Sequence, residues 1–84
     1  MAHLYILQSV VTGRFYVGST SDLPRRLSEH TRDHSPFTRG RGPWRVVYQE
    51  EFADLREARG RERQIKSWKS RRAIHKLIAA SSAG

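Results

Sequence analysis

Two short hydrophobic runs near the start of the chain predict a β-hairpin. The first spans Leu4–Val11 and the second spans Arg14–Gly18, and β-branched and aromatic residues are frequent in both. Thr12 and Gly13 stand between the runs and are typical of a tight turn. We therefore expect two adjacent antiparallel strands whose register is set by this short connection.

Helical spacing follows the hairpin. Leu23 and Leu27 are four residues apart and share one face, which predicts a helix over about Leu23–Asp33. Ser21 or Asp22 is suited to cap its first turn. The next segment, His34–Pro43, contains glycines and prolines that break both periodicities, and we expect it to be an irregular loop.

The rest of the chain predicts one strand and two helices. Trp44–Tyr48 has the composition of a strand, and Asp54 is placed to cap a helix that follows it. A break over residues 67–70 separates this helix from a basic amphipathic helix centred on residues 73–78. Residues 81–84 are expected to fray. The predicted element order is β-β-α-β-α-α, which is an α+β arrangement.

Length and composition narrow the classes of function. The 84 residues are enough for one small domain, which we place at residues 1–80. The chain has 16 Lys and Arg against 8 Asp and Glu, a formal charge of +8, which indicates a polyanionic partner: nucleic acid first, an anionic membrane surface second. The absence of Cys excludes a disulfide framework and Cys-type zinc fingers. With no apolar run long enough to span a membrane and no signal-peptide pattern, we expect a cytoplasmic protein.

Several short motifs then point to one family. In chain order they read YI at Tyr5, YVGST from Tyr16, RRLSEH from Arg25, GPW from Gly42 and RERQIK from Arg61. This ordered set resembles the GIY-YIG nuclease superfamily, in particular its short single-domain bacterial branch, over about residues 3–77. The resemblance implies a small three-stranded antiparallel sheet flanked by helices. It also implies hydrolysis of DNA phosphodiester bonds with a divalent metal, Mg²⁺ or Mn²⁺, and no organic cofactor.

The resemblance also assigns candidate catalytic residues. Tyr5 and Tyr16 match the motif tyrosines, Arg26 the catalytic arginine, His30 the histidine one turn later, and Glu62 the metal-binding glutamate. These types suit the reaction: a guanidinium grips a phosphate oxygen, a phenol or imidazole moves protons, and a carboxylate holds the cation. Which tyrosine acts as the general base stays open at this stage.

Two departures from the family pattern favour an alternative function. His3-Leu4 replaces the Gly-Ile that precedes the first tyrosine, and the chain contains no Asn, whereas many family members carry a late asparagine near the metal or phosphate. A catalytically weak or inactive nucleic-acid-binding module is therefore the main alternative. A ribosome-associated basic protein is a third, and it predicts RNA affinity without dependence on metal.

The substrate preference is predicted from the expected loop. Its aromatic and arginine residues are typical of a surface that binds single strands, so we expect single-stranded, flapped or branched DNA. A separate DNA-reading domain has no room in this chain, and we therefore expect low sequence specificity. Trp44 is interpreted as a core anchor of the third strand. The residues expected to contact nucleic acid are Arg25, Phe37, Arg39, Arg41 and Lys66.

Overall fold

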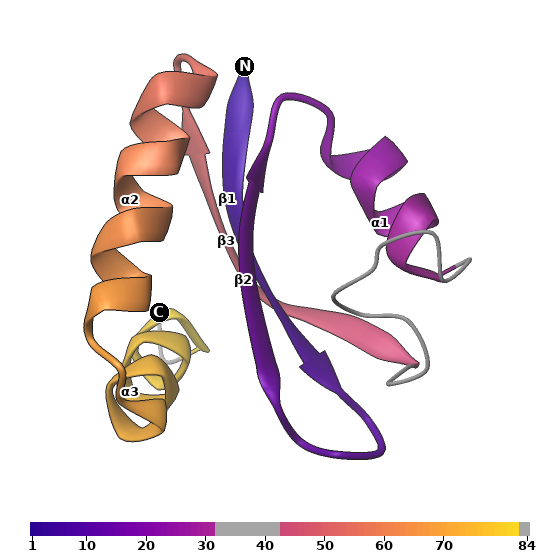
Figure 1. Ribbon diagram of the computed structural model, residues 1–84, viewed down its shortest axis with the longest axis vertical. Coiled ribbons are helices and arrows are strands. Elements are labelled where there is room, and N and C mark those ends of the chain that lie inside the picture. Colours follow the sequence, from indigo (N-terminus) through magenta and orange to yellow (C-terminus); the bar gives the residue numbers. More distant parts are fainter. Residues whose placement is uncertain (32–42, 83–84) are drawn as a thin grey trace.

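A three-stranded antiparallel sheet with helices on both faces forms the molecule (Figure 1). The computed structural model describes residues 1–31 and 43–82. The elements are β1 (Ala2–Ser9), β2 (Phe15–Thr20), α1 (Leu23–Thr31), β3 (Trp44–Phe52), α2 (Leu55–Ser67) and α3 (Arg71–Ser82). The spatial order of the strands is β2-β1-β3. The predicted α+β class and element order are confirmed.

The central strand β1 divides the core into two layers. Leu4 and Ile6 point to the face covered by α2 and α3, because alternate side chains of a strand lie on opposite faces. Tyr5 and Leu7 point to the other face, where they pack against Leu23 of α1. Each of these four β1 side chains is at most 1% exposed, so β1 is buried on both faces. No helix in the described residues is long and apolar enough to cross a membrane.

The hairpin turn begins earlier than the hydrophobic run predicts. The expected strand reaches Val11, but β1 ends at Ser9. The Ser9 hydroxyl accepts hydrogen bonds from the backbone N–H groups of Val11 and Thr12, at 3.2 and 3.0 Å, and the Gly13 N–H donates to the Ser9 carbonyl at 2.9 Å. Val10 and Val11 are consequently 64% and 72% exposed. Local capping by Ser9 has outweighed the β propensity of the two valines.

The third strand is longer than its composition predicts. It was expected over Trp44–Tyr48 and runs on through two glutamates to Phe52. One of them, Glu50, receives a hydrogen bond from the Tyr48 hydroxyl and pairs with Arg61 of α2 at 3.1 Å. This partner on a distant element explains why an acidic stretch remains in the sheet. Trp44 is partly buried against the α1-side cluster, as expected of a core anchor.

The junction between α2 and α3 contains an unusual backbone conformation. Asp54 caps α2 as predicted, since its carboxylate accepts from the Glu57 N–H at 2.9 Å, and Ser70 caps α3 through the Ala73 N–H at 3.1 Å. The predicted break between the helices is confirmed. Within it, Lys69 has φ 48°, in the left-handed region where glycine is favoured.

Gly60 offers a direct test of the packing around α2. A Cβ built at this helical position meets nothing within 4 Å, so Ala fits without strain. We expect Gly60→Ala to raise the free energy of unfolding by about 1 kcal/mol, because Ala loses less backbone entropy in a helix. Urea denaturation measures the change. A lower midpoint would contradict the open surroundings of Gly60.

Candidate active site

The candidate site is built around β2, which is an edge strand of the sheet. Strand alternation puts Tyr16 and Gly18 on the face of α1, and Val17 and Ser19 on the face of α2. Residues 1–31 and 43–82 contain no strand beyond β2 on this side, so side chains from the two faces can meet around its edge. The edge strand therefore brings α1 and α2 residues to one place.

The motif glycine allows Tyr5 to cross the hairpin. Tyr5 of β1 is paired with Gly18 in the ladder, and a Cβ at Gly18 would lie 2.6 Å from both Cζ and the hydroxyl oxygen of Tyr5. The Tyr5 and Tyr16 rings are 6.3 Å apart between centroids, at an interplanar angle of 39°. Tyr5 thus extends over the backbone of β2 and places its hydroxyl group beside Tyr16.

The electrostatics of Tyr5 show what surrounds that hydroxyl. Burial raises its pKa well above the ordinary value for a phenol, and the nearby Tyr16 and Glu62 raise it further. Arg26 acts in the opposite direction, because its positive charge favours the phenolate. Tyr5 therefore remains protonated at neutral pH. Four of the five predicted catalytic residues interact electrostatically around this one group.

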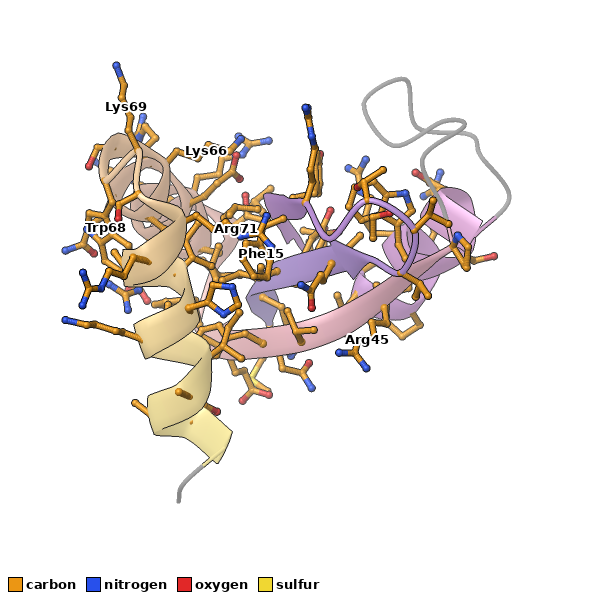
Figure 2. All side chains as sticks on the ribbon, turned by 90° about the horizontal axis from the view of Figure 1, so that it is seen from below. Phe15, Arg45, Lys66, Trp68, Lys69 and Arg71 are labelled. Atoms are coloured by element: carbon orange, nitrogen blue, oxygen red, sulfur yellow. The ribbon has the colours of Figure 1, made fainter. Side chains whose placement is uncertain are left out.

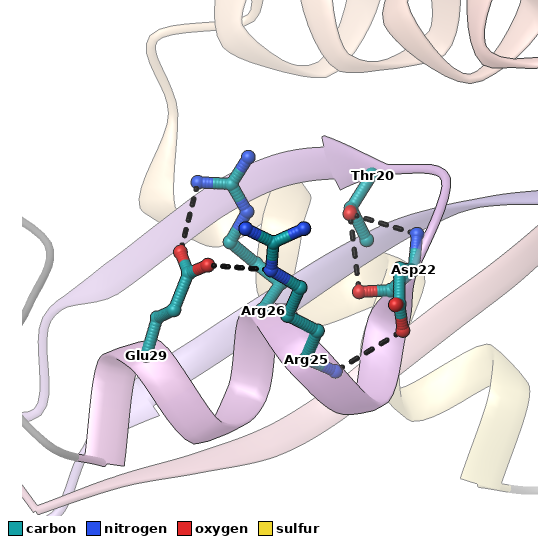
Figure 3. Close-up of polar contacts among 5 residues, drawn as sticks. All are labelled: Thr20, Asp22, Arg25, Arg26 and Glu29. Atoms are coloured by element: carbon teal, nitrogen blue, oxygen red, sulfur yellow. Dashed lines mark hydrogen bonds and ion pairs between the residues drawn. The ribbon is translucent and has the colours of Figure 1, made fainter.

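Arg26 lies on α1 in a small polar network (Figure 3). Asp22 caps the helix, accepting from the Arg25 N–H at 3.2 Å. Glu29 then pairs with both arginines: Arg25 Nε lies 3.3 Å from Oε1, and Arg26 Nη1 lies 3.6 Å from Oε2. The side chains of Arg25 and Arg26 are 77% and 44% exposed, so both remain accessible to an anion. A polar cavity of about 190 Å³ adjoins them.

Glu62 reaches the site from the opposite face of the sheet. The Ser19 hydroxyl donates to its Oε1, and Lys66 Nζ lies 2.6 Å from its Oε2. A single carboxylate suits Mg²⁺ or Mn²⁺, because such ions keep several waters and take further ligands from substrate phosphates. Within residues 1–31 and 43–82, no group of three His, Cys, Asp or Glu residues is assembled. Glu62 could hold the predicted ion, and in this structure the Lys66 ammonium provides the positive charge beside its carboxylate.

The remaining predicted residues lie outside this description. His30 belongs to α1, one turn after Arg26, but its side chain is not among the described ones. Phe37, Arg39 and Arg41 lie outside the described residues. The roles of these residues stay predictions. The predicted extension of the first helix over residues 32 and 33 also falls outside the described residues.

The sequence predicts the pairing of Glu29 with Arg25, but neither its contact with Arg26 nor the contact of Ser19 with Glu62. Ser19 follows the motif glycine directly, and strand alternation alone indicates that it faces away from Tyr16 toward the α2 side. Glu29 stands three residues after Arg26 and four after Arg25, the spacings at which helical side chains meet. Both residues hold a candidate catalytic group in place.

Gly18→Ala tests the crossing of Tyr5 over β2. The added Cβ overlaps with the ring of Tyr5, a residue that is only 1% exposed, so we expect the free energy of unfolding to fall by about 1–3 kcal/mol. Urea denaturation, with near-ultraviolet circular dichroism of the tyrosines, measures the effect. Gly60→Ala is the matched control, since the same substitution there is expected to stabilise. Equal stability of Gly18→Ala and the parent protein would contradict the close approach.

Known proteins are similar in sequence to most of this chain. The profile described as the GIY-YIG catalytic domain matches residues 1–75. The UPF0213 protein VNG_2274C of Halobacterium salinarum is 39% identical over 67 residues, which cover 79% of this chain and 86% of that protein. The UPF0213 protein CPE1444 of Clostridium perfringens is 40% identical over 67 residues, covering 79% and 71%.

A solved structure shares the fold as well. The solution NMR structure of the UPF0213 protein BH0048 from Bacillus halodurans superposes with a TM-score of 0.61 at 35% sequence identity. The match covers 95% of this chain and 85% of that one. The same fold and much of the same sequence therefore occur together in a second protein.

Proposed function

The chain belongs to the GIY-YIG catalytic-domain family, a family of nucleases, and on that premise we propose that it is a divalent-metal-dependent DNA endonuclease. One observation supports this activity above the others. Tyr16, Arg26 and Glu62 come from β2, α1 and α2, and all act on the hydroxyl of Tyr5 at the edge of the sheet. A proton-transfer group, a phosphate-binding cation and a metal-binding carboxylate are thereby grouped in one accessible place.

The two tyrosines take different roles in this proposal. Tyr5 is 1% exposed, and its raised pKa keeps it a neutral phenol, so it serves as a positioning residue that hydrogen-bonds to its neighbours. Tyr16 is only partly buried, and we assign it the general-base role, in which its phenolate form takes the proton from the attacking water. The difference in exposure between the two tyrosines supports Tyr16 as the general base, a choice that the sequence leaves open.

Arg26 and Glu62 act on the phosphate from two sides. Arg26 binds a non-bridging oxygen through its planar fork of N–H donors, and this contact strengthens as negative charge develops. Glu62 would hold the divalent ion, which would supply positive charge to the phosphate and to the leaving oxygen. Ser19 fixes one carboxylate oxygen of Glu62, and release of Lys66 frees the other.

The proposed substrate is single-stranded, flapped or branched DNA, cut with low sequence specificity. The formal charge of +8 supports a polyanionic substrate, and cationic side chains that bind phosphates carry no sequence information. Arg25 and Lys66, on the described surface, are proposed as phosphate contacts, with His30 as a second proton-transfer group. The alternative is a weak or inactive DNA-binding module, favoured by the absence of Asn.

Incubation with labelled DNA tests the function. Single-stranded, duplex and flapped DNA are each incubated with the protein in Mg²⁺, in Mn²⁺ or in EDTA. We expect cleavage of the single-stranded and flapped forms that EDTA abolishes. Binding without cleavage under every metal condition would favour the inactive module, and cleavage in EDTA would contradict the role of the metal.

A further inference from the structure

A groove lies where the start of β2 meets the junction between α2 and α3. Its volume is about 520 Å³. Phe15 and Ile74 are among the apolar side chains that line it, and four cationic side chains accompany them: Arg14, Lys66, Lys69 and Arg71. Figure 2 shows Arg71 beside Phe15 and Lys66 near them, whereas the side chain of Lys69 extends outward from the helix junction; Arg45 lies at a distance from all four.

The charge of this groove has one sign. Among the described residues that line it there is no carboxylate. Arg71 lies over the ring of Phe15, 5.3 Å from the centroid, so an aromatic contact rather than an ion pair holds it. Lys66 is 52% exposed and is paired with Glu62 on the side of the candidate active site. Glu62 offsets part of the charge of Lys66, and Arg14, Lys69 and Arg71 add further positive charge to a lining that contains no carboxylate among the described residues. Such a cluster creates a positive potential that attracts a polyanion.

We propose that this groove binds the DNA strand on one side of the cleaved bond, with phosphates on Lys66, Lys69 and Arg71. The inference rests on the function proposed above and deepens it by giving the path of the substrate. Two residues connect the groove to the active site: Tyr16 lines it, and Lys66 is the ion-pair partner of Glu62. A strand that leaves the active site therefore passes directly into the groove.

The dimensions of the groove fit one strand. Its volume lies in the range of small-ligand pockets, which is enough for a segment of nucleotide size. Arg71 already lies over the face of Phe15, and His75 makes a T-shaped contact with the same ring, with ring centroids 5.0 Å apart. A base stacked on Phe15 is thus not expected. We expect the groove to contact the sugar–phosphate backbone of the DNA strand and not its bases, so its affinity does not depend on the DNA sequence.

Lys69 allows the inference to be tested without loss of the fold. Its φ of 48° suits Gly better than any residue with a Cβ, so Lys69→Gly removes a groove cation and relieves an unfavourable conformation together. We expect its urea midpoint to equal or exceed that of the parent protein. A loss of DNA binding in this variant consequently reports on the groove and not on unfolding.

The experiment measures the binding of a fluorescent single-stranded oligonucleotide by anisotropy in EDTA, over a series of salt concentrations. For single strands, loss of one phosphate contact lowers the slope of log K against log[salt] by about 0.7, which weakens binding about 5-fold near 0.1 M salt. We expect these changes for Lys69→Gly. Adding Arg71→Gln is expected to double the change in slope.

Lys76→Ala is the matched control, because it removes one lysine charge from α3 outside the groove. It is expected to change affinity much less than Lys69→Gly. Equal losses of affinity in the two variants, or parental affinity in Lys69→Gly, would overturn the proposal that the groove binds DNA. Cleavage of DNA by the parent protein would still support the proposed nuclease activity in that case. If DNA binding depended on the groove cations but no DNA were cut, the proposed nuclease activity would be overturned and the binding groove would stand. A change in self-association in place of DNA affinity would assign the groove to a second copy and overturn the proposal.

Discussion

Arg26→Ala is expected to lower the kcat of DNA cleavage by about two to three orders of magnitude, as removal of an electrostatic stabiliser of the transition state typically does. The fold is expected to survive, because Arg26 is 44% exposed and its ion pair with Glu29 spans 3.6 Å. Steady-state kinetics on a labelled flapped substrate measures the effect, and circular dichroism verifies the fold.

Two further variants show whether Arg26 acts by geometry or by charge alone. Arg26→Lys keeps the charge but loses the planar fork, so we expect little recovery of kcat. Arg25→Ala removes the same charge from the neighbouring position, where the side chain also pairs with Glu29, and we expect it to raise KM while kcat changes little. Parental kcat in Arg26→Lys would contradict bidentate binding of the phosphate.

Much of the fold follows from local patterns, and the errors occur where a distant or competing contact decides. The caps at Asp22 and Asp54 are readable because a cap involves residues only three apart. The end of β1 cannot be predicted in this way. The β-branched Val10 and Val11 favour a strand, but the Ser9 hydroxyl accepts hydrogen bonds from the N–H groups of Val11 and Thr12 and ends it. The acidic end of β3 is equally hidden, because the partner that stabilises Glu50 there lies on α2.

The candidate site divides in the same way. Hairpin pairing predicts that the two motif tyrosines lie close together, and the ladder makes them diagonal neighbours: Tyr5 opposite Gly18, Tyr16 opposite Leu7. The approach of Glu62 from the other face depends on β2 being an edge strand, and strand order is a property of the whole sheet. The cationic groove likewise combines residues of β2, β3, α2 and α3, which no local pattern relates.

Glu62→Gln is expected to abolish metal-dependent cleavage while affinity for single-stranded DNA in EDTA stays within a factor of about two. The amide keeps the size of the side chain and can still accept the Ser19 hydrogen bond, but it removes the charge that holds a divalent cation. Calorimetric titration with Mn²⁺ measures the loss of the ion directly, and anisotropy measures DNA binding. Cleavage near the parental rate would show that Glu62 is not the metal ligand.

Lys66→Met makes the opposite change at the same carboxylate. In the free protein the Lys66 ammonium lies 2.6 Å from Oε2 of Glu62, so it competes with a cation for that oxygen. Without this competitor, Mn²⁺ is expected to bind several-fold more tightly, because Coulomb attraction to a carboxylate that is only 21% exposed is no longer offset. DNA affinity is expected to fall in the same variant, since Lys66 also lines the groove. If Mn²⁺ affinity fell together with DNA affinity, Lys66 would be supporting the metal site rather than competing for it. That result would contradict the hypothesis that a metal ion displaces the Lys66 ammonium from Glu62.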